Sequence, residues 1–287
     1  MKHINYILFS LTFGLLSSTL SLGQEVSSSS YEEETNQHSI NPIENYQVMS
    51  TVSLWIRMNL RAPGNEGFFT EDYELSKVII DAVKNDRILP YKDDSFKERM
   101  SKEEFFAKLR IPQTELENDI ANQASNDIFN NGTALALEEE DSLYGPRNVY
   151  LVDVKIERKF DRQRSSMYND ILGMTLIIPA TETGERQVNI PVGAFSYREL
   201  YEQVFHQKRN GALQDNPEAI WFNNRNPAQN QNLGDAFALN FYQGRLLKYR
   251  SPRTGEMVDI EAGAKGYSKG EQIKAWLIDQ ENFLWEW

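Results

Sequence analysis

Residues 150–157 read Tyr-Leu-Val-Asp-Val-Lys-Ile-Glu, and this stretch decides the fold of the chain. Tyr150, Val152, Val154 and Ile156 fall on alternate positions, with mostly polar residues between them. Successive side chains of a β-strand point to opposite faces of a sheet. The alternation therefore predicts a strand that is buried on one face only.

Two further strands are predicted downstream of this stretch. Residues 172–178 are largely apolar and stop at Pro179, and residues 187–192 form another short run after the turn residues Thr183 and Gly184. Runs of this length bounded by turn residues are typical of strands, and three of them in succession suggest a small antiparallel sheet. A helix that begins at Ser196 is expected to flank it. We therefore expect an α+β lobe over residues 146–287.

Helices are the stronger expectation before this lobe. Between residues 75 and 83, apolar side chains recur at the i, i+3, i+4 and i+7 spacing of an amphipathic helix. Ser101 and Glu104 have the spacing of a capping box, in which each side chain bonds the backbone N–H of the other. This pattern predicts that a second helix starts at residue 102.

The remainder of the N-terminal half is less regular. Residues 52–58 are too densely apolar to show one period, so a short helix and a buried strand are equally plausible. Residues 113–141 are rich in Asn, Asp and Glu and are interpreted as an acidic insertion. The predicted fold class is thus α+β, with a helical N-terminal lobe over residues 47–145 followed by a small antiparallel sheet flanked by helices.

The N-terminus has the pattern of an export signal. A short positive start precedes the apolar residues 4–20, and small residues at 21 and 23 suit a signal peptidase. Residues 1–23 are therefore predicted to be a signal peptide. Residues 24–46, with four consecutive serines and three consecutive glutamates, are predicted to be a disordered linker. The expected location is a bacterial periplasm.

Composition excludes several functions. The 287 residues include no cysteine and only three histidines, which removes disulfides, thiolate nucleophiles and Cys/His zinc sites. The net charge of -12 repels phosphates and anionic lipids, so neither nucleic-acid binding nor direct membrane insertion is expected. We expect no catalytic residue, no cofactor and no metal site. A protein-binding surface is the more plausible functional element.

A charged cluster follows the first predicted strand of the sheet. Glu157 and Asp161 lie near Arg158, Arg162 and Arg164 in sequence. Two carboxylates with nearby guanidinium groups resemble the acid pair of a glycoside hydrolase. A mutually neutralising salt-bridge cluster is the favoured interpretation, because acids and arginines occur in similar numbers. The three arginines are then candidates for contacts with a partner protein.

Aromatic side chains supply the other candidate contacts. Trp221 and Phe222 form an apolar island between polar loops, and Trp285 and Trp287 lie at the chain end. Such rings can stack on sugars or anchor a protein partner, and the terminal position favours an anchor. Packing into the core is the competing explanation for each. The alternative to an assembly protein is a periplasmic carbohydrate-binding protein or carboxylate-dependent hydrolase.

Several segments taken in order resemble the GldN family, called PorN in non-gliding relatives. The resemblance is carried by Phe-Asp-Arg-Gln-Arg-Ser-Ser-Met at 160–167, Ile-Leu-Gly at 171–173, Trp-Phe-Asn-Asn-Arg-Asn at 221–226, residues 233–249, and Leu-Trp-Glu-Trp at 284–287, with 55–59 and 88–91 in the N-terminal half. The likeness runs from about residue 46 to the end. Residues 190–195 and the acidic segment 113–141 depart from the family pattern.

The resemblance implies a function. It identifies the chain as a non-enzymatic subunit of the Bacteroidetes type IX secretion and gliding motility machinery. The implied partners are the outer-membrane lipoprotein GldK (PorK), with which it would form a ring, and the GldL–GldM (PorL–PorM) motor. Association with the outer membrane would then run through the lipoprotein.

Overall fold

The computed structural model describes residues 37–44, 46–112, 143–183, 187–209, 212–252, 254–260 and 263–285. The predicted signal peptide and most of the predicted linker lie outside the described residues. So does the whole of the acidic segment 113–141. The predicted boundaries of these segments therefore stay predictions.

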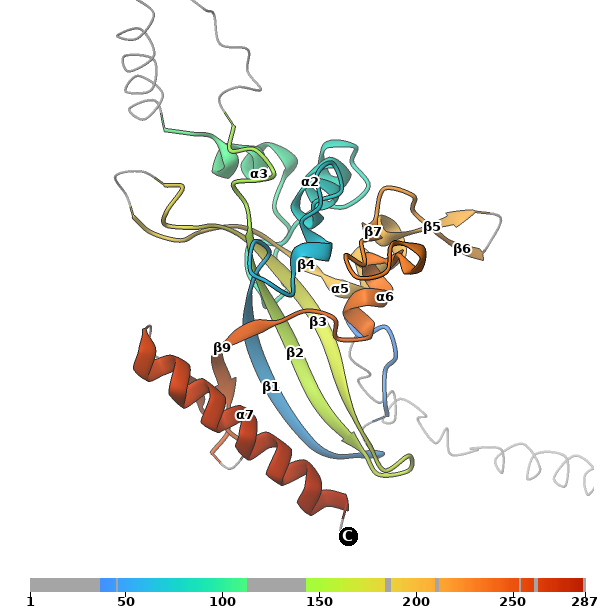
Figure 1. The fold of residues 1–287 in the computed structure, drawn as a ribbon, viewed down its shortest axis with the longest axis vertical. Coiled ribbons are helices and arrows are strands. Elements are labelled where there is room, and N and C mark those ends of the chain that lie inside the picture. The colour runs from blue at the N-terminus through green and yellow to red at the C-terminus, as the bar shows by residue number, and fades with distance from the viewer. Residues whose placement is uncertain are drawn as a thin grey trace, which may run out of the picture. The chain divides into compact units, whose positions relative to one another are not determined.

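The main element is a six-stranded antiparallel sheet with the strand order β10-β9-β1-β2-β3-β4. Figure 1 shows the long strands β1, β2 and β3 side by side, with β9 next to β1. The strands are β1 (Val48–Asn59), β2 (Leu151–Asp161), β3 (Ser166–Ile178), β4 (Ile190–Ser196), β9 (Gly244–Arg250) and β10 (Met257–Asp259).

The strand predicted from residues 150–157 is confirmed as β2, in the middle of the sheet. Val152, Val154 and Ile156 are at most 1% exposed and belong to the main apolar cluster. The strand continues to Asp161 and pairs along its length with β1 and β3. The sheet is therefore larger than predicted.

Helices and short segments surround the sheet. Figure 1 shows α2, α5 and α6 gathered toward one end of the long strands and α7 lying along β9. The elements are η2 (Glu66–Phe68), α2 (Leu75–Lys84), α3 (Lys102–Leu109), α5 (Tyr197–Glu199), η5 (Leu200–Phe205), η6 (Pro227–Gln229), α6 (Leu233–Ala238) and α7 (Ala264–Trp285), with the hairpins β5 (His206–Arg209)/β6 (Ala212–Asp215) and β7 (Ile220–Trp221)/β8 (Gln231–Asn232).

The prediction of a helical N-terminal lobe is not what the structure shows. Residues 48–59 form β1, which lies between β9 and β2 in the same sheet as the C-terminal strands. The inward side chains Val52, Leu54 and Met58 join the same apolar cluster as β2. Local periodicity could not reveal this, because β1 is stabilised by strands that are distant in the sequence.

The two predicted N-terminal helices are confirmed as α2 and α3. Ser101 caps α3, since its side chain accepts a hydrogen bond from the backbone N–H of Glu104. A serine cap of this kind stabilises a helix by about 1 kcal/mol. Phe105 and Leu109 of α3 are fully buried, so this short helix is held mainly by packing.

The outer face of the sheet carries a second, smaller apolar cluster. Tyr91 and Phe96 pack on Leu172 of β3 and Ala194 of β4. The approach is close, because a Cβ added to Gly173 would lie 2.1 Å from the Phe96 ring. The loop that contains Phe96 therefore covers part of the face that the alternation in β2 marks as polar.

Candidate interaction surfaces

Ion pairs cover the polar face of β2. Asp153 accepts two hydrogen bonds from Arg57 on β1, at 2.7 and 2.8 Å. Lys155 donates to the backbone oxygen of Asp94 at 2.6 Å, and burial lowers its pKa. Paired in this way, these side chains are structural rather than available to a ligand.

Lys159 is the most buried cation on this face. Its Nζ lies 2.8 Å from Asp170 Oδ2 and 3.0 Å from Glu157 Oε2. Burial acts to lower the pKa of Lys159, but the hydrogen bonds and charges of Asp170 and Glu157 outweigh it and raise that pKa. Removing the lysine would leave two acids uncompensated, which is costly for buried groups.

Glu157 and Asp161 do not form an acid pair. They are four positions apart on one strand, which separates their Cα atoms by roughly 13 Å at about 3.3 Å per residue. The paired carboxylates of a glycosidase must both face the bond that is cut. Glu157 is bound to Lys159, while Asp161 accepts the backbone N–H groups of Gln163 and Arg164. The geometry therefore favours the salt-bridge interpretation over the hydrolase.

The three candidate arginines have different surroundings. Arg158 points to the inner face of the sheet and pairs with Glu281 of α7, so it joins two elements of its own chain. Arg162 and Arg164 are exposed on the turn between β2 and β3. Asp161 holds this turn by accepting hydrogen bonds from the backbone N–H groups of Gln163 and Arg164. Only the two turn arginines are presented outward.

Trp221 and Phe222 are half-buried against their own chain. The Trp221 ring lies 6.2 Å from Phe68 and 5.0 Å from Phe241, centre to centre. Phe222 meets Tyr73 edge to face at 5.1 Å. Packing explains both residues without a partner. A role for either in partner binding stays a prediction.

The terminal tryptophans fall at the limit of the described residues. Trp285 is the last residue of α7, and its side chain is outside the description. Trp287 lies wholly outside the described residues. Their predicted role as anchors is therefore untested.

The structure reveals a surface on α7 that the sequence interpretation missed. Leu277 docks the helix, being 3% exposed, and Lys274 Nζ donates to the backbone oxygen of Gly244 at 3.1 Å. Four large side chains remain exposed. They are Tyr267 (58%), Trp276 (37%), Ile278 (53%) and Phe283 (52%), and we call them the α7 surface.

The α7 surface has two parts. With 3.6 residues per turn, Tyr267 and Ile278 lie on one side of the buried Leu277, and Trp276 and Phe283 lie on the other. Each part borders a hollow between the helix and the sheet. Tyr267 lines a hollow of about 610 Å³, and Trp276 lines one of about 810 Å³. The helix is thus attached along a narrow stripe, with apolar side chains on both flanks.

The sequence contained a signal for this surface. Ile273, Trp276 and Leu277 predict an apolar stripe, and the structure buries Leu277 and half-buries Ile273 while leaving Trp276 exposed. The additional apolar residues at 278 and 283 lie outside any single helical stripe. A helix with more apolar residues than one face can bury is expected to leave some of them exposed, and this pattern indicates the surface.

The described residues form neither a metal-binding cluster nor a membrane-spanning helix. No group of three or more His, Asp or Glu side chains there is arranged to hold a metal ion. Within the same part of the chain, no helix is both long and apolar enough to cross a membrane.

Comparison with known protein families gives one match. The model of the family described as "Gliding motility associated protein GldN" matches residues 43–286. That range begins before β1 and ends after α7, so it includes every strand of the six-stranded sheet and the whole of α7. A search of curated proteins finds no match.

Proposed function

The chain belongs to the GldN family of gliding motility and type IX secretion components, and we propose that it is a non-enzymatic structural subunit that acts by binding other proteins. The α7 surface is the observation that carries the proposal. Each flank of α7 carries two large exposed apolar side chains beside a hollow, and exposed apolar surface of this kind commonly marks protein-binding sites. Its aromatic members are also the residue types enriched at interfaces.

The proposed partners follow from the family. The subunit assembles with the outer-membrane lipoprotein GldK (PorK) into a periplasmic ring, and the ring is coupled to the GldL–GldM (PorL–PorM) motor. The predicted signal peptide and the absence of cysteine from the sequence support this arrangement, because a bacterial lipoprotein carries its N-terminal lipid on a cysteine. The lipoprotein would then supply the link to the outer membrane.

Ring formation requires that each copy also touches its neighbours. Contacts between unlike surfaces of identical chains close into a ring when the rotation between them permits. The α7 surface and the turn that carries Arg162 and Arg164 are separate exposed features, which suits contacts of this unlike kind. Arg158 contributes indirectly, because it holds α7 in place through Glu281.

Size-exclusion chromatography tests the proposal. The purified mature chain is run alone, with the soluble part of the lipoprotein, and with an unrelated periplasmic lipoprotein domain as the control. The proposal predicts that the chain and GldK elute together as a species larger than one of each. Separate elution of the two proteins at concentrations well above micromolar would contradict it.

A further inference from the structure

Strand β3 has one half without an outer neighbour. Eleven of its 13 residues, between Ser166 and Ile177, pair with β2, but β4 pairs only with residues 173–178. Among the described residues, no strand pairs with the outer edge of residues 166–172. This open stretch is roughly 20 Å long at about 3.3 Å per residue. An unpaired edge offers backbone N–H and C=O groups to an added strand.

The 37–44 segment passes this edge without closing it. Ser39 Oγ donates to Asp170 Oδ1 at 2.8 Å, and His38 Nδ1 lies 3.0 Å from Ser196 Oγ. No backbone hydrogen bond between described residues joins residues 40–43 to the strand. A cavity of about 680 Å³ remains between them, which we call the β3 slot. Its size is in the range of about 300–1,000 Å³ typical of ligand sites.

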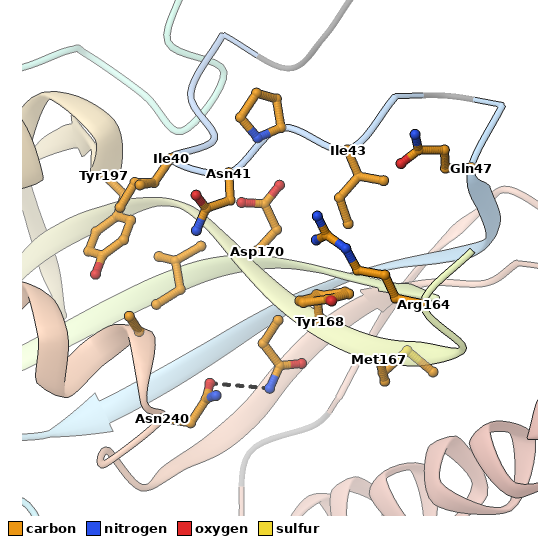
Figure 2. Close-up of a pocket in the computed structure, with 14 residues that line it drawn as sticks. Ile40, Asn41, Ile43, Gln47, Arg164, Met167, Tyr168, Asp170, Tyr197 and Asn240 are labelled. Carbon is orange, nitrogen blue, oxygen red and sulfur yellow. Dashed lines mark hydrogen bonds between the residues drawn. The ribbon is translucent and has the colours of Figure 1, made fainter. Parts of the chain in front are cut away.

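The slot has walls on two sides. Figure 2 shows Ile40, Asn41 and Ile43 on one side and Asn240 on the other, with Asp170 directed toward the 37–44 segment. Asn169 of β3 donates to Asn240 at 3.2 Å and joins the strand to the end of α6. A slot walled in this way suits one extended segment.

The lining gives the occupant its chemistry. Met167, Ile171 and Ile43 provide apolar contacts. The charge of Asp170 is already offset by Lys159 at 2.8 Å. Arg164, at one end, is 70% exposed and lies 3.8 Å from Asp161. Complementary charges favour binding and fix orientation, so an acidic residue is favoured beside Arg164.

We infer that the β3 slot binds an extended segment of a partner protein, which adds to the sheet as a strand beside residues 166–172. The segment has apolar residues at alternate positions and an acidic residue that meets Arg164. Backbone hydrogen bonds supply affinity in this mode, and side-chain pockets supply specificity. This inference rests on the proposed function in that the partner belongs to the same assembly.

Hydrogen exchange is the direct test. Backbone exchange is measured for the isolated chain and for the chain within the assembly purified from its host envelope. The inference predicts at least tenfold slower exchange at alternate amides of residues 166–172 in the assembly, with little change at residues 173–178, which β4 already protects. An assembly that contains the chain but leaves residues 166–172 unprotected overturns the inference and leaves the proposed function standing. A chain that enters no assembly overturns both.

A charge reversal sharpens the test. Arg164→Glu is predicted to reduce the protection of residues 166–172 about tenfold, equivalent to about 1.4 kcal/mol. Arg225→Glu makes the same charge change at an exposed residue of another loop and is predicted to have no effect. Equal effects of the two variants contradict the proposed role of Arg164. Protection that arises in the purified chain alone, at high concentration, identifies a second copy as the occupant and overturns the assignment to a partner.

Discussion

The helices α2 and α7 differ in how much of their apolar surface the protein buries. In the ten residues of α2, the side chains Leu75, Val78, Ile79, Ala82 and Val83 are at most 4% exposed. Among the described side chains of the 22-residue helix α7, one large apolar side chain, Leu277, is buried to that degree. Helices in proteins are stabilised mainly by burial of an apolar face. By that measure α2 is a structural element, whereas α7 has apolar side chains that its own chain leaves largely uncovered.

This difference separates two meanings of an apolar residue in one sequence. Ile79 and Ile278 are the same residue type on two helices, but Ile79 is 0% exposed and Ile278 is 53% exposed. The first stabilises the fold, because its removal opens a cavity. The second contributes little to the fold and is available for binding.

Substitution in α2 should have the largest effect on stability. Ile79→Ala is expected to lower the free energy of unfolding by about 2–5 kcal/mol, the range for buried large-to-small changes. Denaturant unfolding followed by circular dichroism measures it. A loss below about 1 kcal/mol would mean that α2 is less tightly packed than its burial indicates.

Loosening α7 should have an intermediate effect. Arg158→Ala removes the partner of Glu281, and both side chains are partly buried, at 19% and 25% exposed. The expected cost is about 1–2 kcal/mol, between the values for exposed and buried ion pairs. Hydrogen exchange should become faster across α7 and stay unchanged in α2. The control is Arg162→Ala, which removes an exposed arginine and should leave both helices unaffected.

Acid should act on another lightly attached part, the 37–44 segment. Burial lowers the pKa of His38 from its ordinary value of 6.5, with Glu199 opposing the shift and Lys155, Arg99 and Arg198 adding to it. The folded state therefore favours neutral His38. Its contribution is complete above about pH 6.5 and is lost as the pH falls below that value. The protection factors of residues 37–44, which are exchange rates corrected for the intrinsic rate at each pH, should fall between pH 7.5 and 5, and a His38→Gln variant should lose most of this dependence.

The smallest effect is expected at Ile278. Ile278→Ala should change the free energy of unfolding by no more than about 0.5 kcal/mol, as for other exposed positions. The same unfolding experiment as for Ile79→Ala measures it. A cost near that of Ile79→Ala would remove the distinction between the two helices.

Local patterns predicted much of the fold. The alternation at residues 150–157 predicted β2, and the helical spacing and capping box predicted α2 and α3. The place of β1 could not be predicted, because its neighbours β2 and β9 are distant in the sequence. After α6, Asn240 adopts the left-handed conformation, with φ of 58°, which Asn tolerates.

The candidate surfaces were harder to predict than the fold. Sequence identified Arg158, Arg162 and Arg164 as a group, but strand alternation sends Arg158 to α7 while the turn exposes the other two. It also identified Trp221 and Phe222, which pack against residues of the N-terminal half. Exposure on α7 depends on how narrow its docking stripe is. That property emerges only when the helix meets the sheet.

Binding by the α7 surface is the central claim, and one matched pair of variants tests it most directly. Ile278→Asp places a charge on the α7 surface, and Val188→Asp places the same charge at another β-branched residue with the same 53% exposure. Each variant is assayed for co-purification with the secretion assembly. The account predicts that Ile278→Asp is lost from the assembly by at least tenfold while remaining folded, and that Val188→Asp is retained. Full retention of Ile278→Asp would contradict it.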